Sequence, residues 1–247
     1  MIQLELIQEL EKVVRSPLHV IVMSGGGIDL TYIRDSNQCA SLIWMGYPGQ
    51  SGGLALATVV FGQYNPGGRL PVTIYPASYV NSVSMLDMQM RPSSSNPGRT
   101  YKFYTGTPVY EFGFGLSYTT FTYATSSNSV IQRISMNRFY QIHQVINSIR
   151  VNVTNTGDLP GDDVVLAYVS LPNTILGYVA PFRQLFGFQR VHLAVNETVQ
   201  LFFPFTVENA LVIHTDGSSW LHPGTYRISI DQQLDIIVIL DGEPMRF

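Results

Sequence analysis

The spacing of apolar residues differs between the two halves of the chain. In the first half, apolar positions follow a helical period over residues 2–14, which predicts an amphipathic helix that Pro17 ends. Two nearly continuous apolar runs follow at 18–23 and 41–45. Helical patterns come after each run, at 28–36 and 53–62. This order predicts an α/β architecture, with a partial parallel sheet and flanking helices. The apolar stripe of the first helix consists of Ile2, Leu6, Leu10, Val13 and Val14.

From about residue 126 onward, apolar and polar residues alternate, as they do in half-buried strands. About seven short strands within roughly 120 residues are typical of an all-β immunoglobulin or fibronectin III-like sandwich. The segment between the halves, 87–125, is rich in Gly, Pro, Ser and Tyr and predicts an irregular connector. The predicted strands lie at 149–157, 163–171, 198–205, 210–214, 225–230 and 234–240.

We therefore predict three segments: a partial α/β domain over 1–86, the connector over 87–125, and the sandwich over 126–247. Two parallel strands are too few for a stable covered sheet, so the remaining strands are expected upstream of Met1. The chain start also lacks the basic residues and the apolar core of a secretion signal.

Composition excludes several classes of partner. The formal net charge is -3 and lysines and arginines do not cluster, which argues against a nucleic-acid ligand. No apolar run is long enough to span a bilayer, so no membrane partner is expected. Cys39 is the single cysteine, which permits no internal disulfide. The five histidines are scattered, so no metal site is expected.

The glycine-rich stretch VIVMSGGGIDLTYI, residues 20–33, is a candidate phosphate loop. A dinucleotide loop needs a third glycine, but Leu30 stands at that position after Gly25 and Gly27. A P-loop needs a lysine that is absent here. No cofactor is therefore predicted, and the stretch is interpreted as a tight turn in which Asp29 caps the following helix.

A second motif, GQSGG at 49–53, matches the nucleophile elbow of serine hydrolases, with Asp87 and His143 downstream in the expected order. Tyr47, Pro48 and Gly49 lie between the strand and Ser51, however, whereas an elbow places its serine at the strand end. The favoured interpretation is a glycine-rich turn with Ser51 at a helix N-cap. A serine hydrolase using Ser51 remains a less favoured hypothesis.

Glycoside hydrolysis requires two carboxyl groups on opposite sides of the sugar. Asp29, Asp35, Asp87 and Glu111 are available, but no pair stands out, so no catalytic residue is assigned.

Long motifs then point to one family. The segment WMGYPGQSGGLALATVVFGQYNPGGRLPVTIYP (44–76), with VIVMSGGGID before it and YEFGFGLSYTTFTY after it, resembles glycoside hydrolase family 3. Residues 90–119 resemble its plant β-D-xylosidase / α-L-arabinofuranosidase branch. Residues 152–169, 185–198 and 221–230 are similar to the fibronectin type III-like domain that ends those enzymes.

The resemblance implies that the chain is the C-terminal part of an enzyme whose (β/α)8 barrel carries the aspartate nucleophile. The acid/base glutamate is expected upstream of Met1 as well, so the chain alone is expected to be inactive. The two glycine-rich turns would form the wall of a sugar pocket. The wall residues are Gly26, Gly27, Asp29, Tyr47 and Gln50, where Gln50 stands in place of a common glutamate.

The implied substrates are pentose-containing oligosaccharides or polysaccharides from xylan and arabinan, and the implied location is extracellular, in the cell wall. Two sequons then predict glycosylation at Asn152 and Asn196. The alternative from another class is a non-catalytic fibronectin-like module that binds a partner or a polysaccharide.

Overall fold

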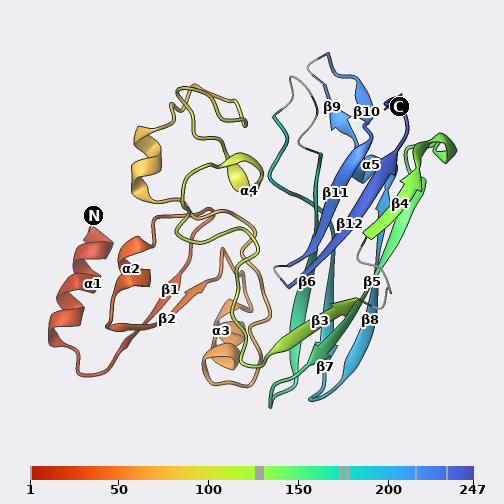
Figure 1. Ribbon diagram of the computed structural model, residues 1–247. Coiled ribbons are helices and arrows are strands. Elements are labelled where there is room, and N and C mark those ends of the chain that lie inside the picture. The colour runs from red at the N-terminus through yellow and green to blue at the C-terminus, as the bar shows by residue number, and fades with distance from the viewer. Residues whose placement is uncertain (1, 126–130, 173–174, 176–178, 215, 232) are drawn as a thin grey trace. The chain divides into compact units, whose positions relative to one another are not determined.

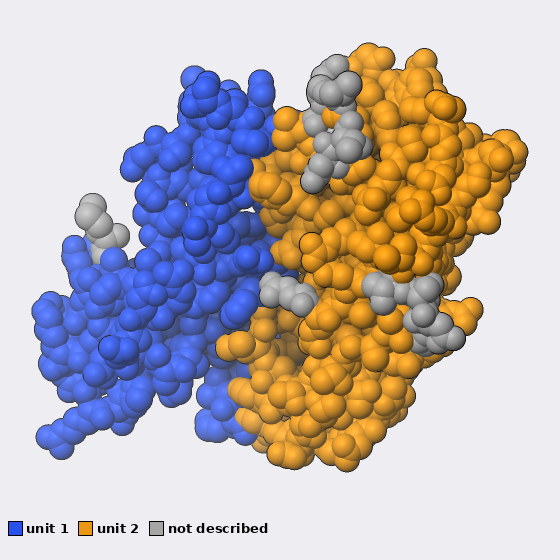
Figure 2. Space-filling model, in the orientation of Figure 1, with its two compact units in different colours: residues 1–61, 70–100, 104–114 blue, residues 62–69, 101–103, 115–247 orange. Residues whose placement is uncertain are grey.

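The computed structural model describes residues 2–125, 131–172, 175, 179–214, 216–231 and 233–247, which form two compact units (Figures 1 and 2). The predicted start of the sandwich at residue 126 lies outside the described residues. The boundaries 86/87 and 125/126 therefore stay predictions. Unit 1 comprises Met1–Phe61, Leu70–Thr100 and Tyr104–Phe114, and unit 2 comprises Gly62–Arg69, Tyr101–Phe103 and Gly115–Phe247.

Unit 1 contains the predicted parallel pair of strands. Strand β1 (Leu18–Val22) pairs with β2 (Cys39–Trp44), and the register ends with Val22 opposite Trp44. The helices α1 (Ile2–Val13), α2 (Thr31–Asp35) and α3 (Gly52–Val60) confirm the helical patterns. Two shorter helices follow, η1 (Ala77–Asn81) and α4 (Thr100–Phe103).

The core of unit 1 is small. It is built from Val22, Leu30, Ile33, Ile74 and Val109. Helix α1 contributes Ile7 to this core, but the apolar stripe expected from the sequence is uncovered in the described structure. Ile2, Leu6 and Val13 are 82%, 58% and 74% exposed. The helical period therefore predicts the helix correctly, while Ile7, which is not part of the expected stripe, is the α1 residue that packs against the core.

Unit 2 is a β-sandwich, as predicted. Its larger sheet has the order β4-β12-β11-β6-β7, and the facing sheet has the order β3-β5-β8. Side chains from both sheets share one core, and the ring centroids of Phe205 on β8 and Tyr226 on β11 lie 6.2 Å apart. The bounds of these strands are β3 (Phe121–Thr125), β4 (Ile131–Ser135), β5 (Val145–Asn155), β6 (Gly161–Ser170), β7 (Gln184–Leu193), β8 (Thr198–Thr206), β11 (Gly224–Ile230) and β12 (Leu234–Asp241).

A third, smaller sheet in unit 2 has the order β13-β10-β9. It consists of β9 (Val212–Ile213), β10 (Ser219–Leu221) and β13 (Met245–Arg246). The predicted strand at 210–214 is shorter than expected, because the helix α5 (Val207–Ala210) occupies its first residue. A short 3-10 helix, η2 (Met136–Arg138), follows β4. Strands β3, β4, β7, β10 and β13 were not among the predicted ones.

The segment 62–69 belongs to unit 2, although it lies more than 50 residues before β3 in the sequence. Asn65 donates to the carbonyl of Asp162 over 3.0 Å and accepts from the backbone N–H of Tyr118 over 2.7 Å. The contact is close: a Cβ on Gly67 would lie 2.3 Å from the same Asp162 oxygen. Residue 67 must therefore be glycine for this segment to lie against β6.

Candidate functional site

In unit 1, two loops leave the carboxyl ends of the adjacent parallel strands β1 and β2 and contact each other. The indole N–H of Trp44 donates to the hydroxyl of Ser24 over 3.0 Å, and that hydroxyl donates to the carbonyl of Gly26 over 2.7 Å. A Cβ on Gly25 would lie 3.0 Å from the ring of Tyr47. Since open α/β sheets bind ligands at this edge, the loops 23–29 and 45–51 form the candidate site.

The expected wall residues differ in what they offer to a ligand. Tyr47 is 79% exposed, and Gln50 is also exposed. A Cβ on Gly26 would meet nothing within 4 Å, whereas one on Gly27 would lie 2.9 Å from Ile74. Gly26, Tyr47 and Gln50 therefore present surface, while a side chain at position 27 would displace the end of the Ile74 side chain.

Asp29 holds the first loop in place. Its carboxylate accepts hydrogen bonds from the backbone N–H and the hydroxyl of Thr31, over 2.9 and 2.6 Å, and from the backbone N–H of Ala77 over 2.9 Å. Partial burial disfavours its charge, but these hydrogen bonds outweigh that effect and hold the pKa of Asp29 below its usual value. Asp29 thus accepts from the N–H of Thr31, the first residue of α2, as predicted, although the N-cap position itself is Leu30, which has no side-chain cap.

The other carboxylates considered from the sequence do not form a catalytic pair with Asp29. Asp35 pairs with its neighbour Arg34 over 2.7 Å. Asp87 accepts from the backbone N–H of Gln89 and from the side chain of Asn96, both over 2.9 Å, and so orders its own loop. No catalytic role follows from these contacts.

The serine hydrolase hypothesis also finds no support in the contacts. Ser51 occupies the N-cap of α3, but its side chain makes no capping hydrogen bond, contrary to the expectation from the sequence. His143 lies 3.1 Å from Glu208 and is largely exposed. Asp87 bonds an asparagine instead of a histidine. Each proposed triad member therefore lacks the partner that nucleophile activation requires.

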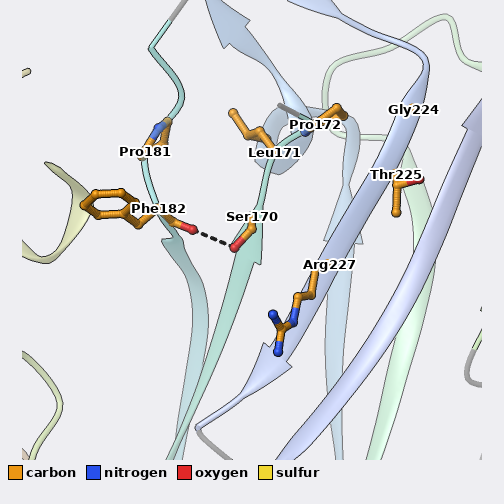
Figure 3. A pocket seen from close by; sticks show the side chains of 8 residues that line it. All are labelled: Ser170, Leu171, Pro172, Pro181, Phe182, Gly224, Thr225 and Arg227. Atoms are coloured by element: carbon orange, nitrogen blue, oxygen red, sulfur yellow. Dashed lines mark hydrogen bonds between the residues drawn. The ribbon is translucent and has the colours of Figure 1, made fainter. Parts of the chain in front are cut away.

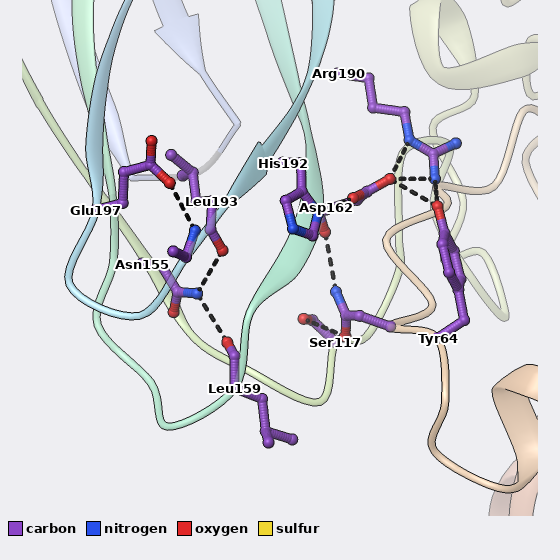
Figure 4. Close-up of polar contacts among 11 residues, drawn as sticks. Tyr64, Ser117, Asn155, Leu159, Asp162, Arg190, His192, Leu193 and Glu197 are labelled. Atoms are coloured by element: carbon purple, nitrogen blue, oxygen red, sulfur yellow. Dashed lines mark hydrogen bonds and ion pairs between the residues drawn. The ribbon is translucent and has the colours of Figure 1, made fainter.

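In unit 2, a polar cluster gathers around Asp162 at the start of β6 (Figure 4). One carboxylate oxygen lies 2.6 Å from Nδ1 of His192, and the other accepts from Arg190 and from the hydroxyl of Tyr64 over 2.7 Å. Partial burial opposes ionisation, but the bonds from Tyr64, His192 and Arg190 lower the pKa of Asp162 to about 2. No local pattern in the sequence indicates this cluster, because Tyr64 lies 98 positions from Asp162.

A second cluster is buried beside it. Arg69 lies 3.0 Å from Asp163 and 3.8 Å from Asp231, and the hydroxyl of Tyr123 donates to Asp163. One guanidinium thus faces two carboxylates. Burial raises the pKa of Asp231 to about 6, with Arg69 opposing the shift and Asp163 adding to it. A small cavity of about 150 Å³ adjoins Arg69, Tyr123 and Asp163.

A larger surface pocket of about 550 Å³ lies in unit 2 (Figure 3). Its polar groups already have partners: Ser170 donates to the carbonyl of Phe182 over 2.6 Å, and Arg227 pairs with Asp235 over 2.9 Å. Among the described residues that line it, none carries a carboxylate. It is lined by Ser170, Leu171, Pro172, Pro181, Phe182, Gly224, Thr225 and Arg227.

Two further observations concern the described residues as a whole. No group of three or more His, Cys, Asp or Glu side chains among them is arranged to hold a metal ion. Among the same residues, no helix is both long and apolar enough to cross a membrane.

Comparison with known proteins places these features in a family. Residues 2–118 match the model of the glycosyl hydrolase family 3 C-terminal domain, and residues 163–233 match the fibronectin type III-like domain. Probable beta-D-xylosidase 6 of Arabidopsis thaliana is 40% identical over 81% of this chain, and exo-1,4-beta-xylosidase xlnD of Aspergillus awamori is 38% identical over 98%. The chain covers 28% and 32% of these two relatives.

Comparison with solved structures leads to the same family. A family 3 exo-beta-xylosidase, XlnD, bound to a xylobiose aziridine probe, superimposes with a TM-score of 0.90 and 36% identity, covering 99% of this chain and 33% of that one. A beta-D-glucoside glucohydrolase from Trichoderma reesei, with a TM-score of 0.76 and 24% identity over 96% of this chain and 35% of that one, shares the fold. The chain therefore belongs to glycoside hydrolase family 3 and carries the family's C-terminal α/β domain and a fibronectin type III-like domain.

Proposed function

We propose that these residues serve in an enzyme that releases xylose from xylan-derived oligosaccharides, and that the loops 23–29 and 45–51 line its sugar pocket. The observation that carries the proposal is the contact of the loop 23–29 with the carboxyl end of β2, through Ser24 and Trp44, and with the loop 45–51, through Gly25 and Tyr47. The relatives named xylosidases and the probe-bound XlnD structure support xylose as the sugar.

Within this pocket the residues have different roles. Tyr47 offers an exposed aromatic ring to the apolar face of a sugar, and Gln50 offers an amide that donates to and accepts from hydroxyl groups. Asp29 orders the first loop of the pocket wall, because its carboxylate accepts hydrogen bonds from Thr31 and Ala77. The nucleophile and the acid/base group then come from outside residues 1–247, as the family resemblance implies.

The proposal extends to the setting of the enzyme. Arabinan-derived pentosides as further substrates, an extracellular location in the cell wall and glycosylation at Asn152 and Asn196 all fit the xylosidase branch. A pentose oligosaccharide is accordingly the proposed partner, and neither nucleic acid nor membrane lipid is proposed.

A first experiment measures p-nitrophenol release from p-nitrophenyl β-D-xyloside by residues 1–247 alone at high concentration. No turnover is expected, since retaining enzymes hold two carboxyl groups about 5–5.5 Å apart at the sugar. Turnover that Asp29→Asn or Glu111→Gln abolishes would show that a catalytic carboxylate lies in this chain.

A second experiment places residues 1–247 in the Aspergillus awamori enzyme, in exchange for the matching part. Xyloside hydrolysis is expected, and Tyr47→Ala should raise KM about tenfold in the chimera. Tyr140→Ala is the matched control, because Tyr140 is 78% exposed and Tyr47 is 79% exposed. Equal KM values for both variants would remove Tyr47 from the pocket.

A further inference from the structure

Two histidines meet beside the smallest sheet of unit 2. His214 follows β9 and His222 follows β10, and their Nε2 atoms lie 3.1 Å apart. The ring centroids are 5.3 Å apart and the ring planes differ by 19°. The centroid separation nearly equals the Nε2 to Nε2 distance plus the two ring radii, so the nitrogens point directly at each other.

This head-on geometry defines the chemistry of the contact. Two ring nitrogens within hydrogen-bond distance need one proton between them, so one ring carries Nε2–H and the other accepts through Nε2. A metal ion would require both lone pairs to converge on a third point, which the observed arrangement does not provide. The contact is therefore a hydrogen bond in which one imidazole donates its Nε2–H to Nε2 of the other.

Further contacts tie the pair to the sheet. The backbone N–H of His214 donates to Ser218 over 2.9 Å, and the hydroxyl of Tyr226 on β11 donates to the carbonyl of His222 over 2.7 Å. The ring centroid of Trp220 lies 6.0 Å from that of His214 and 6.3 Å from that of His222. Opening of the pair would thus loosen β9 and β10 together.

The charged groups that act on this region are few. Asp216 is engaged by the N–H and the hydroxyl of Ser218, over 2.9 and 2.6 Å, and interacts electrostatically with His214 and with Arg246 on β13. Burial, and then the neighbouring His214, lower the pKa of His222. Asp216 carries one negative charge, which can offset one positive imidazole but not two.

We propose that the hydrogen bond between His214 and His222 is an acid-sensitive latch: it stabilises the sheet β13-β10-β9 at neutral pH and breaks when both rings are charged. The neutral pair and the pair with one added proton both keep an N–H between the rings. A second added proton removes the acceptor and places two like charges 3.1 Å apart, so the pair separates.

The test is amide hydrogen exchange of the full chain between pH 7 and pH 4.5, corrected for the intrinsic effect of pH. Protection of residues 211–222 should fall at least about tenfold relative to β5 and β8, and His214→Gln or His222→Gln should remove this difference. His143→Gln is the control, because His143 is exposed and pairs with Glu208. Unchanged protection, or pH dependence that persists in both variants, would overturn the latch.

Histidine-selective NMR of the unsubstituted chain gives a second readout that needs no variant. The pKa of His222 is expected below the ordinary histidine value, because burial and the neighbouring His214 disfavour its positive charge. A His222 titration at or above the ordinary value would contradict the proposal. Addition of Zn²⁺ alone at pH 7 should leave protection of 211–222 unchanged, and an increase that both variants abolish would identify a metal site instead.

Discussion

The hydroxyl of Thr154 lies 2.8 Å from the hydroxyl of Thr198, on the paired strands β5 and β8. These threonines are the third residues of the two sequons, so the predicted glycosylation sites are neighbours in the sandwich. Their asparagines nevertheless differ. Asn152 lies within the central strand and accepts from Gln200 over 3.0 Å, whereas Asn196 lies in the exposed turn before β8.

This difference predicts unequal glycosylation in a secretory eukaryotic host. Asn196 should carry a glycan on most molecules and Asn152 on few, because turns are accessible to a modifying enzyme and central strands are not. Mass spectrometry of the intact glycopeptides measures both occupancies, with Thr198→Ala and Thr154→Ala as site-specific controls. Equal occupancy, or a glycan on Asn152 alone, would contradict this prediction.

A second prediction concerns pH and Asp231. Its folded pKa of about 6 lies above the ordinary value of 3.8, so its proton stabilises the fold at low pH. That contribution is lost as the pH rises from about 4 through about 6. We therefore expect Asp231→Asn to stabilise the chain by about 1–3 kcal/mol at pH 7.5 and to have little effect at pH 4.

Urea unfolding at both pH values measures the effect. Asparagine is a suitable replacement because Asp231 has a φ of 47°, which asparagine adopts readily. Asp235→Asn is the control, since Asp235 is an exposed partner of Arg227. A stability difference that is the same at pH 4 and pH 7.5 would show that Asp231 does not bind the proton.

Arg69 provides a third prediction. Its replacement by Met leaves Asp163 and Asp231 without their shared cation, and such losses destabilise proteins by about 3–5 kcal/mol. The matched control is Arg133→Met, whose partner Asp241 is exposed and whose loss should cost less than about 1 kcal/mol. Adding Asp231→Asn should reduce the cost of Arg69→Met. Equal effects of the two arginine substitutions would contradict the buried-cluster interpretation.

The fourth prediction concerns Asp162, whose folded pKa of about 2 lies below the ordinary value of 3.8. Its contribution is therefore present above about pH 4 and is lost as the pH falls through about 2. Asp162→Asn should lower the free energy of unfolding by about 1–2 kcal/mol at pH 7 and hardly change it at pH 2. The value at pH 7 is modest because solvent screens the charges of the exposed partners Arg190 and His192. Thermal unfolding measures the difference, and the exposed Asp158→Asn should change stability by less than about 0.5 kcal/mol at either pH.

Local patterns predicted much of the fold. The periodic runs located α1, β1, β2 and α3, because burial imposes its period directly on the sequence. Strand β3 was placed in the connector, since glycine, tyrosine and threonine around Phe121 gave no clear alternation. Strand β7 was missed because Gly187 interrupts its apolar pattern at a close contact, where a Cβ would lie 3.0 Å from Phe203.

Only the parts of the candidate site that are formed by residues close together in the sequence were predictable. The loops at 23–29 and 45–51 follow directly from strand ends, so the sequence indicated them. The clusters of unit 2 were not predictable, because Arg69 meets Asp163 across 94 positions. The scattered spacing of the histidines in the sequence also did not indicate the contact between His214, which follows β9, and His222, which follows β10.

The chain passes between the two units at 61–62, 69–70, 100–101, 103–104 and 114–115. A domain made of one continuous segment can be moved between genes with a cut at each end. Here a cut at 125–126 would separate the sandwich from Asn65, Gly67 and Arg69, on which the start of β6 depends. We therefore expect recombination during evolution to have transmitted residues 62–247 together, as one inherited block.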